Sequence, residues 1–164
     1  MSRLDLFIDR MVSQRACIDW AVDALAGIPG HVFELGLGNG RTYHHLRERM
    51  PDRDIWVFER AVASHPDSTP PDERVILGEM VDTLAAARAH PGPAILIHAD
   101  MGGHNAAKND AFARVASPLI EPLVAPGGLV VSSDRMYFAE LVEETLPTDA
   151  VEGRCFIYRA RPMT

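Results

Sequence analysis

The sequence predicts a single-domain, doubly wound α/β fold in which a mainly parallel sheet lies between two layers of helices. The chain has 164 residues, the length of one domain with one sizeable core. Short, almost wholly apolar runs alternate with helical patterns, and such runs are typical of strands that are buried on both faces. Hydrophobic residues make up 47% of the chain and charged residues 24%, which excludes a disordered or fibrous protein.

The first predicted element is helical. Apolar residues recur at three- and four-residue steps, which predicts one or two amphipathic helices between Leu4 and Ala26. Glycine and proline at positions 27, 29 and 30 end this segment. We therefore expect residues 1–27 to form an N-terminal helical extension and residues 30–164 to form the core of the domain.

The rest of the chain alternates between strands and helices. Apolar runs predict strands at 31–36, 55–58, 75–77, 94–97, 128–131 and 155–158. Helical patterns between them predict helices at 41–50, 81–89, 106–123 and 137–146. In such folds ligands bind beyond the carboxyl ends of the strands, so the residues that follow each strand are the candidates for function.

Charge and cysteine content indicate which binding partners and which cellular compartment to expect. The net charge is -7 and no basic run gathers the 16 Lys and Arg residues, which argues against nucleic acid or a membrane surface as a partner. No stretch reaches the ~18 apolar residues of a membrane span, and Arg3 and Asp5 interrupt any secretory signal, so we predict a cytoplasmic protein. Cys17 and Cys155 lack a CxxC spacing and are expected to be reduced structural thiols.

A glycine-rich turn follows the first predicted strand. Glycines at positions 36, 38 and 40 allow unusual backbone dihedrals and let a ligand approach the main chain. A dinucleotide fingerprint requires GxGxxG, and position 41 is Arg, so the turn disfavours NAD.

Two acids accompany this turn. Glu34 begins it and could hold a cationic amino group, directly or through water, although it would be a poor neighbour for phosphates. Glu59 ends the second strand about 20 residues after Gly40, the separation at which a carboxylate reaches both hydroxyls of a ribose. Together they predict an unphosphorylated nucleoside that carries an amino acid.

This arrangement resembles the class I S-adenosylmethionine-dependent methyltransferases, whose first motif is an acid followed by GxGxG. Further landmarks of that family occur in the same order: Gly78-Glu79 after the third strand, Asp100 at the end of the fourth and Pro126-Gly127-Gly128 before the fifth. The resemblance covers roughly residues 30–134 and implies a Rossmann-like fold, S-adenosyl-L-methionine as cofactor and methyl transfer as the activity. The small size and the run Gly-Asn-Gly-Arg-Thr-Tyr at 38–43 resemble short bacterial members.

The resemblance also implies a set of site residues. The cofactor-binding residues would be Glu34, Gly36, Leu37, Gly38, Gly40, Tyr43, Glu59, Arg60, Gly78, Glu79, Met80 and Asp100. Glu59 would bind the ribose, and Glu79 and the backbone of Met80 would contact the adenine. Family members usually end in an antiparallel strand pair, and residues 148–153 leave little room for the sixth strand, so we expect it to be short or missing.

Asp100 and His104 are the candidate catalytic residues, because each could take a proton from the methyl acceptor. The alternatives are that Asp100 only organises its turn and that His104 is a solvated loop residue. Some similar O-methyltransferases hold a divalent cation with acids at these strand ends, which Asp100 and Asp134 could provide. Arg135 would repel such a cation, so we predict no metal site, and Arg135 could instead bind an acidic substrate.

We therefore expect methyl transfer from S-adenosyl-L-methionine to an unidentified small molecule, since no further domain remains to hold a larger one. The alternatives are a protein that binds this cofactor without methylating, or another nucleoside enzyme such as an aminopropyltransferase. Apolar side chains in the N-terminal segment (Phe7, Met11, Trp20 and Val22) exceed what a peripheral helix needs. They predict that this segment covers the mouth of the active site or a second copy in a homo-oligomer.

Overall fold

A seven-stranded sheet forms the centre of the computed structural model, which describes residues 1–163. From one edge to the other, its strands are β3 (Val75–Leu77), β2 (Ile55–Glu59), β1 (Val32–Leu35), β4 (Ala94–Ala99), β5 (Val124–Ser132), β7 (Phe156–Arg159) and β6 (Val142–Glu143). The first five in chain order run parallel, and β7 runs antiparallel to both of its neighbours. The predicted fold class is confirmed. The strand order reverses between β1 and β4, where a ligand crevice is expected.

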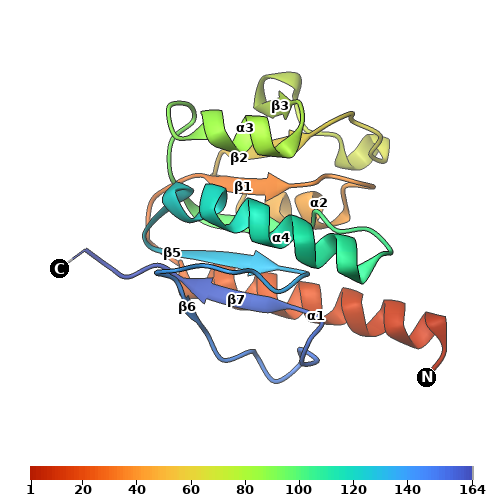
Figure 1. Ribbon diagram of the computed structural model, residues 1–164. Coiled ribbons are helices and arrows are strands. Elements are labelled where there is room, and N and C mark those ends of the chain that lie inside the picture. Colours follow the sequence, from red (N-terminus) through yellow and green to blue (C-terminus); the bar gives the residue numbers. More distant parts are fainter. Residues whose placement is uncertain (164) are drawn as a thin grey trace.

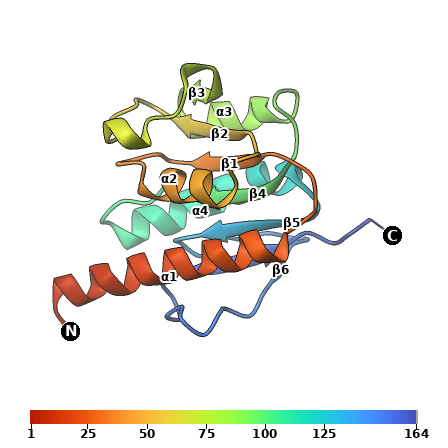
Figure 2. The same cartoon turned by 180° about the vertical axis from the view of Figure 1, so that it is seen from behind.

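Helices cover both faces of the sheet, as the two opposite views show (Figure 1, Figure 2). One face carries α1 (Arg3–Ala24) and α2 (Arg41–Arg49), and the other carries α3 (Met80–Ala87) and α4 (Ala106–Ile120). Short 3-10 turns lie at Pro66–Ser68, Asp72–Arg74 and Glu121–Leu123. Each face has its own apolar core. None of the helices within residues 1–163 combines the length and apolar character needed to cross a bilayer.

The N-terminal segment is one helix of 22 residues. It begins with a capping box, because the side chain of Ser2 accepts from the backbone of Asp5 and the carboxylate of Asp5 accepts from the backbone of Ser2. Its C-terminal half buries Cys17 and Ile18 in the core. Its N-terminal half extends past the carboxyl ends of the parallel strands (Figure 1). The C-terminal half of α1 therefore belongs to the core, and its N-terminal half projects beyond the carboxyl ends of the strands, where ligands of such folds bind.

The segment after β5 differs from the sequence prediction. The helix predicted at 137–146 was wrong: these residues form a loop followed by the two-residue strand β6. The Glu121 carboxylate accepts hydrogen bonds from the backbone of three loop residues, which satisfies donors that a helix would have paired internally. The sixth strand, which we expected to be short or missing, is short: its two residues pair with Tyr158 and Arg159.

Candidate active site

The glycine turn lies at the carboxyl edge of the sheet, between β1 and α2. Gly36, Gly38 and Gly40 all have positive φ, at 85°, 51° and 87°. A Cβ atom on Gly36 would collide with the carbonyl oxygen of Asp100, so only glycine lets the ends of β1 and β4 approach this closely. A Cβ atom on Gly38 would meet nothing within 4 Å. The turn therefore has open space beside its backbone.

We expect Gly36→Ala to destabilise the fold by at least about 2 kcal/mol. The new Cβ atom must displace the backbone of Asp100, and alanine is strained at a positive φ. Urea denaturation would measure the change. Gly103→Ala is the matched control, because a Cβ atom there meets nothing within 4 Å, and an equal loss of stability in both variants would contradict this reading.

Two adjoining cavities lie over the turn. The first, of about 400 Å³, is lined by eight predicted cofactor residues: Gly36, Gly38, Glu59, Arg60, Gly78, Glu79, Met80 and Asp100. The second, of about 240 Å³, lies between the turn and the N-terminal half of α1. Its lining includes the predicted residues Leu37 and Gly40, and also Phe7, Arg10, Met11, Gln14 and Arg41. The two cavities share Gly36, Gly38, Asp100 and Gly102, and together they form one groove.

Three predicted site residues do not line the groove. Tyr43 is buried in the core and has the Arg47 guanidinium 5.4 Å from its ring centroid. His104 is exposed in the loop between β4 and α4. Glu34 is fully buried, where its carboxylate accepts from the Thr42 hydroxyl and lies 2.8 Å from the Nδ1 atom of His98. The Glu34 carboxylate therefore does not reach the groove directly.

Glu59 closes β2 against the glycine turn. Its Oε2 atom accepts from the backbone N–H groups of Leu37 at 2.8 Å and Gly38 at 3.3 Å, and its Oε1 atom accepts from Arg60 at 2.7 Å. Burial by itself would raise the pKa of Glu59, but these backbone donors outweigh it and hold the pKa below its ordinary value. Glu59 is thus an ionised acceptor at the edge of the groove.

Asp100 closes β4 at the junction of the two cavities. Its Oδ1 atom accepts from the Arg10 guanidinium and the Ser133 hydroxyl, each at 2.8 Å, and its Oδ2 atom accepts from the Gln14 amide at 3.0 Å. Burial acts to raise the pKa of Asp100, but His98, Arg10 and these hydrogen bonds outweigh it and lower the pKa. Sequence reasoning missed Arg10, Gln14 and Ser133, because no local motif links α1 or the end of β5 to Asp100.

The low pKa of Asp100 has a consequence for stability. Since the pKa is lower in the folded state, Asp100 stabilises the fold above its unfolded pKa of about 4, and this contribution is lost as the pH falls through the folded value. We expect urea denaturation between pH 5 and pH 2 to show a smaller loss of stability in Asp100→Asn than in the wild type. Equal pH dependence in the two proteins would contradict the assignment.

The end of β5, which we considered together with Asp100 as a possible metal site, has other contacts than the end of β4. Asp134 accepts from the Asn109 amide at 3.2 Å. Arg135 does not line the groove, because its guanidinium pairs with Glu143 on β6 at 3.3 Å and lies over the ring of Phe156. Across residues 1–163 no three His, Cys, Asp or Glu side chains are grouped to hold a metal ion.

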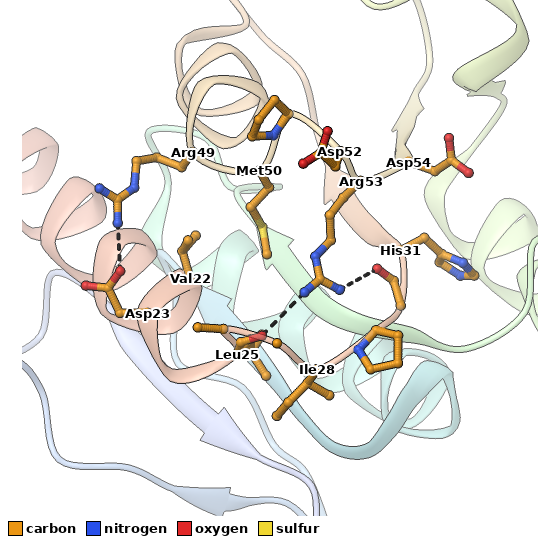
Figure 3. A pocket seen from close by; sticks show the side chains of 15 residues that line it. Val22, Asp23, Leu25, Ile28, His31, Arg49, Met50, Asp52, Arg53 and Asp54 are labelled. Carbon is orange, nitrogen blue, oxygen red and sulfur yellow. Dashed lines mark hydrogen bonds and ion pairs between the residues drawn. The ribbon is translucent and has the colours of Figure 1, made fainter.

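Another cavity, of about 720 Å³, is lined in part by residues that precede β1 and β2 (Figure 3). Its two arginines are bonded to the protein itself: Arg49 pairs with Asp23, and Arg53 donates to the backbone carbonyls of Leu25 and Gly30. It lies at the amino ends of the strands, whereas ligands of doubly wound folds bind at the carboxyl ends. This cavity is therefore not the candidate site.

The chain matches known proteins along its whole length. A family model described as S-adenosyl-L-methionine methyltransferase matches residues 1–160. An S-adenosyl-L-methionine methyltransferase from Silicibacter pomeroyi is 65% identical, with a TM-score of 0.94 over 97% of this chain and 98% of that one. No curated protein matches the chain.

More distant structures share the fold. CalS11, a TDP-rhamnose 3'-O-methyltransferase of calicheamicin biosynthesis, is 14% identical, with a TM-score of 0.63 over 96% of this chain and 83% of that one. Human methyltransferase-like protein 13 in complex with SAH is also 14% identical, with a TM-score of 0.60 over 95% of this chain and 82% of that one. The whole-length family match and the close relative confirm the predicted resemblance. The chain therefore belongs to the S-adenosyl-L-methionine methyltransferase family and is an enzyme that uses this cofactor.

Proposed function

We propose that the groove over the glycine turn binds S-adenosyl-L-methionine, with the adenosine beside Glu59 and the amino-acid end beside Arg10 and Arg41. The chemistry of the donor set fits the cofactor. The larger cavity offers an ionised carboxylate at a strand end and no arginine pair for phosphates, which suits a ribose. The smaller cavity has two arginines and borders Asp100, which suits a carboxylate next to an ammonium group.

The ribose end of this proposal can be tested with Glu59→Ala. We expect the affinity for S-adenosyl-L-methionine to fall by about 1.5–3 kcal/mol, the scale of hydrogen bonds made to a charged group. Isothermal calorimetry would measure the change, with NAD as a ligand that should not bind. Glu73→Ala, at an exposed glutamate outside the groove, is the matched control. Unchanged affinity in Glu59→Ala would remove Glu59 from the ribose site.

Binding of the cofactor's amino-acid end can distinguish a methyltransferase from an aminopropyltransferase, because an aminopropyltransferase uses the decarboxylated cofactor. Arg10 and Arg41 place two positive charges in the smaller cavity. Arg10 is already paired with Asp100, so a decarboxylated cofactor would leave mainly Arg41 without a carboxylate to bind. We expect decarboxylated S-adenosylmethionine to bind at least about tenfold more weakly than the intact cofactor, and Arg41→Ala to remove most of that difference. Equal affinity for the two cofactors would favour the aminopropyl alternative.

The catalytic contribution of the groove is mainly orientation. When bound, the cofactor supplies a methyl group activated by a sulfonium. The residues lining the groove would hold the cofactor in one orientation, so that an acceptor atom could approach its methyl group in line for direct displacement. Asp100 is a poor proton acceptor, because its pKa is lowered and both of its oxygens accept hydrogen bonds. We infer that its charge instead offsets the positive groups of the cofactor.

The main support for this proposal is the hydrogen-bond network that joins α1 to Asp100. It places side chains of α1, a helix that carries no sequence motif, at the centre of the groove. His104 as a base, a homo-oligomer formed through α1 and a cytoplasmic location remain predictions from the sequence. The acceptor is a small molecule whose identity a methylation assay over a metabolite library would give. Turnover that depends on Asp100 and Arg10 would support the groove, and full turnover without them would overturn it.

A further inference from the structure

A buried pair of ionisable side chains lies directly beneath the glycine turn. His98 on β4 and Glu34 on β1 are register partners, both side chains are 0% exposed, and Nδ1 of His98 lies 2.8 Å from Oε2 of Glu34. The other oxygen of Glu34 accepts from the hydroxyl of Thr42 in the first turn of α2. Thr42 lines the smaller cavity, so the pair is connected to the groove through one side chain.

Packing alone does not account for this pair. Nε2 of His98 is the one buried side-chain nitrogen or oxygen without a hydrogen-bond partner within residues 1–163. Such groups normally find partners, because an unsatisfied buried polar atom costs free energy. An apolar pair of the same size would fill this space without that cost. The histidine at this position therefore calls for an explanation beyond filling the core.

The charged and titratable groups around His98 come from three elements. Glu34 lies on β1, Asp100 directly follows β4, and Cys17 on α1 is close enough to act electrostatically on the ring. Burial acts to lower the pKa of His98, but Glu34 and then Asp100 outweigh it and raise the pKa. The two carboxylates thus favour the protonated form of the ring. The ring also lowers the pKa of Asp100, which borders both cavities.

We propose that His98, acting as a cation, is a positioning residue of the cofactor site: it holds the buried Glu34 carboxylate in place and supports the negative charge of Asp100, and through Glu34 and Thr42 it fixes the glycine turn against the sheet. This inference rests on the proposed location of the cofactor. His98 does not line the groove and acts only through Asp100 and Thr42. One buried residue then acts both on the glycine turn and, together with Arg10, on Asp100 at the centre of the groove.

The pH dependence of binding distinguishes this role from a purely structural one. A raised folded pKa means that the contribution of His98 is present below its unfolded pKa of about 6.5 and is lost as the pH rises through the folded value. Wild-type affinity should therefore fall on the alkaline side. In His98→Asn the amide can still donate to Glu34, but the positive charge is gone. The fall in affinity at alkaline pH should therefore disappear. The fall in affinity at acidic pH should move to higher pH, because His98 no longer lowers the pKa of Asp100.

The test is calorimetry with S-adenosylhomocysteine from pH 5 to 8.5 on the wild type, His98→Asn, Thr42→Val and Thr42→Ser. We expect His98→Asn to bind about tenfold more weakly at pH 6.5 and to show the altered profile. Thr42→Val should bind several-fold more weakly with the wild-type profile, and Thr42→Ser should restore the affinity. A wild-type profile in His98→Asn overturns the inference, as does wild-type affinity in Thr42→Val.

Two further measurements distinguish a failure of the role of His98 from misfolding of the variant and from a wrong location of the cofactor. If His98→Asn does not fold, nitrogen-15 NMR of the wild-type histidines decides the question: a doubly protonated His98 ring at pH 7 supports the inference, and a neutral ring overturns it. Glu59→Ala tests the location of the cofactor independently. Weakened binding in Glu59→Ala together with an unchanged profile in His98→Asn overturns only the role of His98, whereas unchanged binding in Glu59→Ala overturns the location itself.

Discussion

Deleting residues 1–12 should leave a folded protein that has lost methyl transfer, whereas deleting residues 1–26 should leave no folded protein. The first deletion removes the projecting half of α1 and with it Arg10, which bonds Asp100 and lines the smaller cavity. The second also removes Cys17, Ile18, Ala21 and Leu25, each at most 1% exposed. Burying a large apolar side chain contributes about 1.5–3 kcal/mol, so their loss approaches the whole stability of a typical domain.

Circular dichroism and thermal denaturation would measure folding of both truncated proteins, and turnover with the wild-type acceptor would measure function. A folded 1–26 deletion that still binds S-adenosyl-L-methionine would contradict the assignment of the C-terminal half of α1 to the core. Normal turnover in the 1–12 deletion would show that the projecting half is not part of the site. Light scattering on the same samples would test whether α1 also joins two copies of the chain.

Asp100→Asn should reduce the affinity for S-adenosyl-L-methionine by about 10- to 150-fold, which corresponds to about 1.5–3 kcal/mol. The amide keeps the size of the side chain but removes the negative charge at the junction of the two cavities. It also leaves the Arg10 guanidinium without its counter-charge. Calorimetry would measure the affinity, and thermal denaturation would show whether the variant is folded.

Asp54→Asn is the matched control for this variant, because Asp54 pairs with Arg74 and lines the cavity of about 720 Å³, outside the groove. We expect its affinity to equal that of the wild type. If Asp100→Asn binds the cofactor as tightly as this control, then Asp100 is not at the centre of the cofactor site.

The sequence predicted those parts of the site that depend on local signals. The glycine turn and Glu59 are marked by their order and spacing at strand ends, and the structure places both at the groove. Arg10 and Gln14 could not be predicted in the same way, because they come from a helix some 90 residues before their partner Asp100. Helix patterns show which residues are apolar but not which polar side chain faces a distant strand end.

Two other differences have equally specific causes. Tyr43 follows the glycine turn closely, but its position in the first turn of α2 directs it into the core rather than the groove. The segment 137–146 has apolar residues at helical spacing, but the contacts of its loop with Glu121 and of β6 with β7 determined the structure instead.

The measurement that tests the central claim most directly is a crystal structure of the protein with S-adenosylhomocysteine. We predict both ribose hydroxyls within about 3.2 Å of the Glu59 carboxylate, and the amino-acid carboxylate within the same distance of Arg10 or Arg41. The ligand would then occupy both cavities and pass beside Asp100. A ligand located away from the glycine turn, or an adenosine without contact to Glu59, would contradict the account.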